Sequence, residues 1–447
     1  MRRAGFRAIF QRHPAREPVI DGVRAIAVLW VLILHILFFH FGTFPDFVQN
    51  VFTGPFTRWI ARGDMGVDLF FIISGILIGG ILLREHQKSN GINLRRFYGR
   101  RIMRLMPVYL VVMLMGVYFL RDIPRAAILA DINPTGNVEN AWANILYVNN
   151  FLSVRDQYMG WCWSLAIEEQ FYLVAPLLIL LLIPWSKRPA LWLLAAFLFS
   201  GWLRFALILY LDVAPPFTDT PDADSWVRRF NLIYIKPYAR YGGLVLGVLS
   251  AYLTLHHRDR VRSFLARPWL TDTLVLGGLV ICIVIACISF RSEFFTSLRN
   301  WSGNDVLGQL YYAHHRDVFA VAIVLLINAA VEGQGNVTKA VRRILSARFW
   351  FPIAQLSYSI YLLHEMYMLW LFPKLAPMLA QNLGLPEAFV VACDGLVVCV
   401  MTVSSAAVLF VLVEYPCMVW RKSTWFERLV GAGPEDQATK KPLATEH

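Results

Sequence analysis

Ten apolar runs of roughly 20 residues divide this chain of 447 residues. A helix of about 20 apolar residues spans the ~30 Å hydrocarbon core of a bilayer, so each run is a candidate transmembrane helix. The composition agrees, because only 16% of the residues are charged, whereas soluble domains average about 25%. We therefore predict an all-α polytopic membrane protein, with transmembrane helices at 19–41, 65–83, 102–120, 164–184, 190–211, 238–255, 271–290, 310–330, 350–372 and 388–413.

The loops between these runs alternate in charge. Basic side chains collect in both tails and in the loops 84–101, 187–188, 256–267 and 331–349, whereas the segment 212–224 is acidic. Because Lys and Arg favour cytoplasmic loops, we expect both termini in the cytoplasm. This orientation divides the chain into a basic cytoplasmic tail (1–18), a ten-helix membrane domain (19–413) and a cytoplasmic C-terminal tail (414–447).

The net charge of +12 follows from this topology. Basic segments beside a membrane bind anionic lipid headgroups, so we expect membrane lipid as a partner and no nucleic acid. The arginines among the first sixteen residues could mark a secretory signal. However, the apolar run that follows is too long and carries no small-residue cleavage site, so we expect an uncleaved tail.

The first apolar run carries Arg24 near one end and His35 towards the other. The eleven residues between them are almost a whole number of helical turns, so both side chains lie on one stripe of the helix. Their Cα atoms would stand roughly 16 Å apart along the axis. An ionisable residue inside a membrane helix is costly and is a functional-site hypothesis by default. Two ionisable residues on one helical stripe indicate a polar path through the bilayer.

The predicted helix directions place further ionisable residues in the outer half of the membrane. Asp68, Glu168 and His364 come to a depth similar to that of His35. A carboxylate that orients an imidazole is the usual construction of a general base. We therefore expect His35 to act as a base with Asp68 or Glu168 beside it. Tyr361 lies on the same helical stripe as His364.

Two arginines begin the third run on the cytoplasmic side. Arg101 and Arg104 are three residues apart and so point the same way. Arg24 lies at a comparable depth. Since guanidinium forks match phosphate oxygens, the three arginines form a candidate anion site at the inner face.

Each of these residues also has a structural explanation. His35 could be a hydrogen-bonded core histidine, Asp68 and Glu168 could be charges at helix ends, and arginines such as Arg101 could only snorkel. The aromatic residues of the outer loop 121–163 could form an interfacial belt or a surface that stacks sugar rings. The sequence has no HExxH, CxxC, GxSxG, Walker A or GxGxxG pattern, so we predict neither a metal site nor a nucleotide-binding fold.

Taken together, these motifs resemble the acyltransferase-3 family of integral membrane acyltransferases. The family's Arg-x10-His motif corresponds to Arg24 and His35, its RxxR motif to Arg101 and Arg104, and its WSLxxE motif to Trp163, Ser164 and Glu168. The family's SGF segment departs here in one position, because residues 74–76 read SGI. The segments that carry the resemblance occur in the family's order: 21–35, 66–78, 97–107, 163–173, 240–249 and 357–364.

The resemblance implies transfer of an acyl group, most often acetyl from acetyl-CoA, to a hydroxyl of an extracytoplasmic glycan or glycolipid. Such O-acetylation modifies cell-envelope polysaccharides, so the family implies the bacterial cytoplasmic membrane. Arg24, Arg101 and Arg104 would then bind acyl-CoA, and Trp163 and Ser164 would bind substrate. His364 and Tyr361 would bind the acceptor or the developing oxyanion. The resemblance is to the stand-alone type without a fused SGNH hydrolase-like domain, for which a second transfer step would need a separate periplasmic partner enzyme.

Two other classes of protein fit part of the pattern. Intramembrane charges, tandem glycines and Pro176 and Pro237 inside apolar runs would suit a transporter or flippase of a glycan or lipid intermediate. Transporters often show symmetric repeats, but the segment 24–35 has no second copy. A non-catalytic scaffold or sensor of an envelope complex is the third possibility.

Overall fold

The structure is a computed structural model, and it describes residues 2–14, 16–120, 138–211, 223–288 and 306–431. Within these ranges every regular element is a helix and no strand occurs. The predicted all-α polytopic membrane fold is thereby confirmed. Most of the predicted acidic segment, the start of the outer aromatic loop and the end of the C-terminal tail fall outside the described residues.

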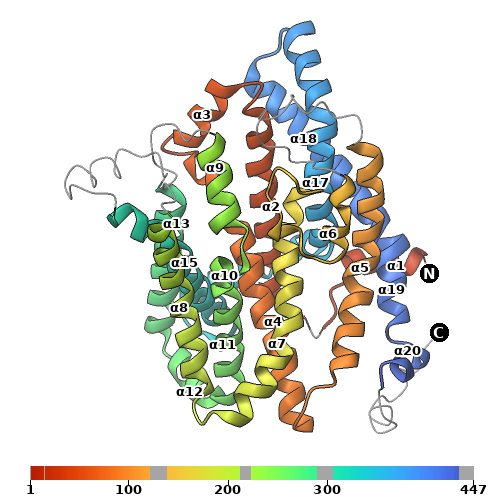
Figure 1. The fold of residues 1–447 in the computed structure, drawn as a ribbon. Helices are drawn as coiled ribbons and strands as arrows, with labels where there is room; N and C mark the ends of the chain where they lie inside the picture. The colour runs from red at the N-terminus through yellow and green to blue at the C-terminus, as the bar shows by residue number, and fades with distance from the viewer. Residues whose placement is uncertain (1, 15, 121–137, 212–222, 289–305, 432–447) are drawn as a thin grey trace.

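Long helices form the body of the molecule (Figure 1). They are α2 (Pro18–His40), α4 (Met65–Ser89), α5 (Leu94–Phe119), α7 (Trp163–Trp185), α8 (Pro189–Tyr210), α11 (Gly242–His256), α13 (Pro268–Cys287), α15 (Val306–Glu332), α17 (Trp350–Pro377) and α18 (Glu387–Leu409).

Short helices complete the described chain. They are α1 (Arg2–Phe10), α3 (Pro45–Thr53), η1 (Arg58–Arg62), η2 (Val138–Asn140), α6 (Ala141–Ile145), η3 (Asn149–Phe151), η4 (Gly160–Cys162), α9 (Ala223–Arg229), η5 (Phe230–Tyr234), α10 (Pro237–Arg240), α12 (Arg258–Leu265), α16 (Asn336–Leu345), η6 (Met378–Asn382), η7 (Phe410–Glu414), α19 (Tyr415–Trp420) and α20 (Thr424–Leu429).

Each of the ten predicted runs corresponds to a helix, and eight helical segments of the described chain are long and apolar enough to cross a membrane. The two other runs correspond to α11 and α17. Helix α11 has 15 residues, or about 22 Å at 1.5 Å per residue, and a further turn, α10, precedes it. Helix α17 carries many polar side chains, most of which are buried against neighbouring helices. The count of ten membrane crossings therefore stays a prediction.

Three close helix contacts build the centre of the bundle. Helix α4 packs along α11, and α17 packs against both α2 and α18. Gly75 of α4 meets the backbone of Leu244 and Gly247 on α11, where a Cβ atom would collide with the Leu244 carbonyl. Small residues allow such close approach of membrane helices. These contacts and the packing of α2 against α4 bring α2, α4 and α17 together around a buried region that six of the ten predicted site residues line.

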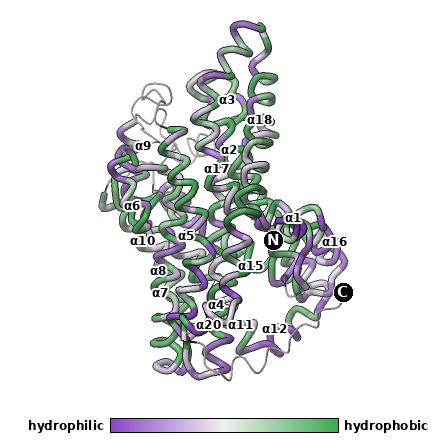
Figure 2. The backbone as a smooth tube through the Cα atoms, turned by 90° about the vertical axis from the view of Figure 1, so that its right-hand side faces the viewer, coloured by the Kyte–Doolittle hydropathy of each residue, from purple (hydrophilic) through white to green (hydrophobic). Residues whose placement is uncertain are grey.

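Several of the basic segments lie at one end of the bundle. Figure 1 shows α12 and the α4–α5 and α7–α8 turns at the same end, and Figure 2 shows hydrophilic residues along α16. Arg262 pairs with Glu332 at 3.4 Å and so joins α12 to the end of α15. Arg12 donates to the Ser346 carbonyl at 3.1 Å and joins the N-terminal tail to the loop after α16. The shared end of α12 and the two turns agrees with the predicted topology. The compartment that this end faces stays a prediction.

Candidate functional site

A cavity of about 450 Å³ lies among α2, α4, α5, α7 and α17. It collects residues that are far apart in the sequence, because these helices pack side by side. Six of the predicted site residues line it: Arg24, Arg101, Arg104, Ser164, Glu168 and Tyr361. The other four, His35, Asp68, Trp163 and His364, lie outside its lining.

The cavity is rich in guanidinium groups. Arg16 and Arg84 line it in addition to the three predicted arginines. Arg24 donates to the Ser357 hydroxyl at 3.0 Å, and the Arg101 guanidinium lies over the Tyr172 ring with its carbon 5.9 Å from the ring centre. Burial and the neighbouring Arg104 lower the pKa of Arg16. Five cations crowded into one space would bind an anion with several charges.

Carboxylates offset only part of this charge. The acidic residues of the lining are Glu17, Asp21, Glu168 and Glu414. Asp21 pairs with Arg12, which is outside the lining, at 2.9 Å and with Arg16 of the lining at 3.9 Å. Glu168 accepts a hydrogen bond from the Tyr172 hydroxyl at 2.9 Å. The lining holds five arginines against four carboxylates, which leaves a small excess of positive charge in the cavity.

Tyr361 occupies one wall of the cavity and connects it to the residues behind. Its hydroxyl donates to the Trp161 carbonyl at 2.8 Å. The same oxygen lies 2.6 Å from the Ser164 hydroxyl, which must be the donor because the tyrosine proton is already used. The Tyr361 carbonyl oxygen lies 2.6 Å from Nδ1 of His364. One residue thus contacts both the cavity and the histidine behind it.

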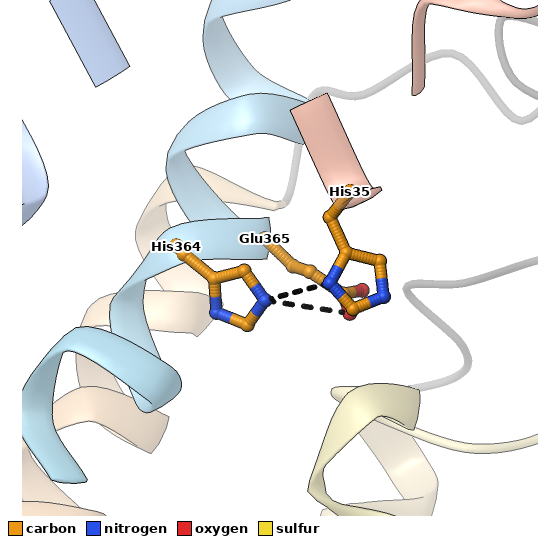
Figure 3. A group of neighbouring side chains, drawn as sticks. All are labelled: His35, His364 and Glu365. Carbon is orange, nitrogen blue, oxygen red and sulfur yellow. Dashed lines mark hydrogen bonds and ion pairs between the residues drawn. The ribbon is translucent and has the colours of Figure 1, made fainter. Parts of the chain in front are cut away.

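The two predicted histidines face each other (Figure 3). Nδ1 of His35, on α2, lies 3.0 Å from Nε2 of His364, on α17. The His35 side chain is 24% exposed, whereas that of His364 is 1% exposed. His35 is therefore the accessible member of the pair. The expectation that His364 binds the acceptor is not favoured by this burial.

Glu365 is the carboxylate beside His35, and the sequence reasoning missed it. Its Oε1 atom lies 3.3 Å from Nε2 of His35. We expected Asp68 or Glu168 beside His35; among the described residues Asp68 pairs with Arg240 and Arg316, and Glu168 accepts from Tyr172. Their role beside His35 stays a prediction. The sequence signal that could have identified Glu365 is its charge within the apolar run 350–372.

Asp68 belongs to a separate buried ion network. Its carboxylate pairs with Arg316 of α15 and, at 3.3 Å, with Arg240 of α10. Arg316 also pairs with Asp64, directly before α4. The Arg240 guanidinium carbon in turn lies 5.3 Å from the centre of the Trp163 ring, which is itself buried. Asp68 and Trp163 thus contribute to contacts between helices through Arg240 and Arg316, and neither is part of the cavity lining.

His35, His364 and Glu365 could also hold a metal ion. One donor atom from each lies within 4.8 Å of the others, and two histidines with one glutamate form a known ligand set for catalytic zinc. The two facing nitrogens are already joined by a hydrogen bond, so a metal would have to replace it. The predicted absence of a metal stays a prediction.

Helices that could cross a membrane thus enclose a cationic cavity beside a histidine pair, which defines an integral membrane protein with a buried polar site. Residues 17–410 match the acyltransferase domain family (Acyl_transf_3), and the chain belongs to this family. The family suggested by the sequence motifs is confirmed.

Two curated relatives show the range of similar proteins. Peptidoglycan O-acetyltransferase OatA of Listeria monocytogenes is 29% identical over 376 residues, which are 76% of this chain and 54% of the relative. Nose resistant to fluoxetine protein 6 of Caenorhabditis elegans is 25% identical over 369 residues, which are 77% of this chain and 44% of the relative. The chain therefore spans about half the length of these relatives. No solved structure matches it.

Proposed function

We propose that this protein is a membrane-bound O-acyltransferase that moves an acyl group, acetyl in the first instance, from cytoplasmic acyl-CoA to a hydroxyl of an extracytoplasmic glycan. The observation that carries the proposal is the position of Tyr361. It lines the arginine-rich cavity and its carbonyl binds His364, the partner of His35. An anion site and a candidate base are thereby neighbours.

The cavity supports binding of the acyl donor. CoA carries phosphate groups, and arginine forms paired hydrogen bonds with phosphate oxygens. Arg24, Arg101 and Arg104 would hold those phosphates, with Arg16 and Arg84 adding positive charge. The eleven-residue separation of Arg24 and His35 corresponds to roughly 16 Å of helix. That length is comparable with an extended pantetheine arm, so a thioester could reach His35 from this site.

His35 would act as the general base of the transfer. Its imidazole removes the proton of the acceptor hydroxyl as that oxygen attacks the thioester carbonyl carbon. A C–O bond forms, the C–S bond breaks, and the proton on His35 passes to the leaving CoA thiolate. Products are an acylated hydroxyl and free CoA, and His35 ends neutral as it began. Transient acylation of His35 is an alternative route to the same products.

The acceptor we propose is a glycan or glycolipid outside the cytoplasmic membrane of a bacterium. The name of the Listeria relative gives peptidoglycan as the molecule that it acetylates, which supports a glycan acceptor for this chain. Acyl-CoA would be a co-substrate, and no metal is part of the proposed step. Any second transfer, to a more distant acceptor, would need a separate periplasmic enzyme as partner.

Replacement of His35 tests this function. We expect His35→Ala to lower the release of free CoA from acetyl-CoA by purified protein by at least 100-fold, since a positioned base contributes about 10²–10⁴-fold. The protein should still fold, because the His35 side chain is partly exposed. His86→Ala is a matched control, as it removes a buried histidine of α4 outside the cavity lining.

Two outcomes would contradict the proposal. If His35→Ala keeps near-normal CoA release, His35 is not the base. If the unaltered protein releases no CoA but moves a glycan or lipid intermediate across vesicles, the transporter or flippase alternative is favoured instead.

A further inference from the structure

The hydrogen bond between the two histidines must have a direction. Nδ1 of His35 and Nε2 of His364 are 3.0 Å apart, and such a bond holds one proton between two nitrogens. One imidazole therefore donates and the other accepts. Each imidazole has a second ring nitrogen, and the hydrogen-bond partner of that nitrogen fixes the tautomer of a neutral ring. This second partner therefore determines which of the two imidazoles donates.

His364 has a partner that can only accept. Its Nδ1 atom lies 2.6 Å from the carbonyl oxygen of Tyr361, and a carbonyl has no proton to give. Neutral His364 must therefore carry its proton on Nδ1 and present the lone pair of Nε2 to His35. His35 in turn donates from Nδ1, which leaves the lone pair of its own Nε2, the atom that lies 3.3 Å from Oε1 of Glu365, to act as the base.

The surroundings of the two rings agree with this assignment. His364 is almost fully buried, so no substrate reaches its Nε2 atom, whereas His35 is about a quarter exposed. Glu365 lies 3.3 Å from Nε2 of His35 and is itself buried. A carboxylate in this place is close to the positive charge that His35 gains when it takes a proton, and a buried charge of this kind needs a nearby counter-ion.

We infer that His364 and Glu365 are positioning residues for the transfer, which rests on the proposed function. His364 holds His35 in the tautomer whose Nε2 atom is the base. Glu365 compensates the charge of the imidazolium. In the step, the hydroxyl proton moves to Nε2 of His35 and from there to the CoA thiolate, while His364 stays neutral and keeps its proton on Nδ1.

Matched substitutions of His364 test the inference in full-length protein in lipid nanodiscs, with acetyl-CoA as the probe and CoA release as the readout. We expect His364→Ala to lower kcat by roughly 10²–10⁴-fold, the usual contribution of a positioned base, with the KM for acetyl-CoA unchanged. His364→Gln keeps an acceptor oxygen close to the position of Nε2. The kcat of His364→Gln should be at least tenfold higher than that of His364→Ala, since His35 can again donate from Nδ1.

The charge of Glu365 is tested by Glu365→Gln, which keeps the shape of the side chain. We expect kcat to fall on the order of tenfold, or about 1.4 kcal/mol of transition-state stabilisation, again with an unchanged KM for acetyl-CoA. An unchanged kcat would overturn the role of Glu365.

The tautomer itself can be observed by solid-state NMR of ¹⁵N-histidine-labelled protein. The His35 signals, assigned by their loss in His35→Ala, should show protonated Nδ1 and unprotonated Nε2. In His364→Ala the Nε2-protonated tautomer should appear, and His364→Gln should restore the original signals. A role of His364 in folding alone would not move these signals.

Three results would overturn the inference. The first is an unchanged kcat in His364→Ala together with a loss of activity in His35→Ala, which leaves the proposed function intact. The second is a His35 tautomer that is the same in all variants. The third is one metal ion per purified chain that is lost in His364→Ala, since a metal would use the Nε2 lone pair of His364. By contrast, full activity of His35→Ala contradicts the proposed function itself.

Discussion

The side chains of Arg101 and Arg104 on α5 line the same cavity as that of Arg24. If these side chains bind the phosphates of acyl-CoA, their removal weakens donor binding and leaves the base in place. We expect Arg101→Ala combined with Arg104→Ala to raise the KM for acetyl-CoA on the order of 100-fold or more, because each charge-assisted hydrogen bond contributes about 1.5–3 kcal/mol. Initial rates of CoA release against acetyl-CoA concentration measure this change.

The control for the two arginines removes the same charge elsewhere. Arg258 and Arg260 are exposed on α12 and lie outside the cavity lining. Arg258→Ala combined with Arg260→Ala should leave the KM for acetyl-CoA unchanged. If both double variants raise the KM for acetyl-CoA equally, only the overall charge of the protein affects donor binding. That result would contradict the assignment of the cavity as the acyl-CoA site.

At the scale of residues, helical spacing predicted the members of the cavity but not the partner of the base. Arg101 and Arg104 point the same way because they are three residues apart, and the alternating loop charges gave Arg24 a similar depth. Depth along a membrane helix does not give the direction around its axis, since each residue turns the side chain by 100°. Asp68 has the right depth but faces α10 and α15, whereas Glu365 faces His35.

At the scale of elements, Asp68 holds three helices together through its arginine partners on α10 and α15. Loss of one partner leaves buried charges uncompensated, which costs about 3–5 kcal/mol. We expect Asp68→Asn to lower the thermal unfolding temperature of the purified protein clearly, while the kcat of the folded fraction stays within about twofold, an effect well below the 10²–10⁴-fold of a catalytic group.

The matched control is Asp259→Asn, at an exposed position of α12. It should change neither the unfolding temperature nor kcat. If Asp68→Asn instead lowers kcat strongly at an unchanged unfolding temperature, Asp68 belongs to the catalytic machinery, as the sequence alone had predicted.

The ends of the helices show where hydropathy stops being informative. Helix α5 begins at Leu94, eight residues before the predicted start at residue 102. Its first turns are rich in arginine and are capped by the Asn93 side chain, which accepts from the Arg96 amide at 2.9 Å. Helix α4 likewise continues to Ser89, past the predicted end at residue 83. Charges predict where a membrane surface lies, but a helix can continue beyond that surface into water.

At the scale of the whole molecule, the fold joins a basic end to a more apolar body. The N-terminal tail contacts the loop after α16, and α12 contacts the end of α15. Arg100 at the start of α5 pairs with Glu427 of α20 at 2.5 Å, which adds the C-terminal segment to the same group. The cavity arginines Arg84 and Arg101 lie near these basic segments in the sequence. The orientation of the bundle therefore decides from which compartment the cavity is filled.

Cysteine labelling with a membrane-impermeant maleimide tests the orientation in intact spheroplasts. We place one new cysteine at Arg260 on the basic end and another at Gln381, exposed in η6 between α17 and α18. Gln381→Cys should be labelled in intact spheroplasts and Arg260→Cys only after permeabilisation, because Lys- and Arg-rich ends stay in the cytoplasm. The unaltered protein gives the background of its native cysteines. The reverse labelling pattern would place the basic end outside the cytoplasm. Cytoplasmic acyl-CoA could then not reach the cavity arginines from that end and would be excluded as the donor.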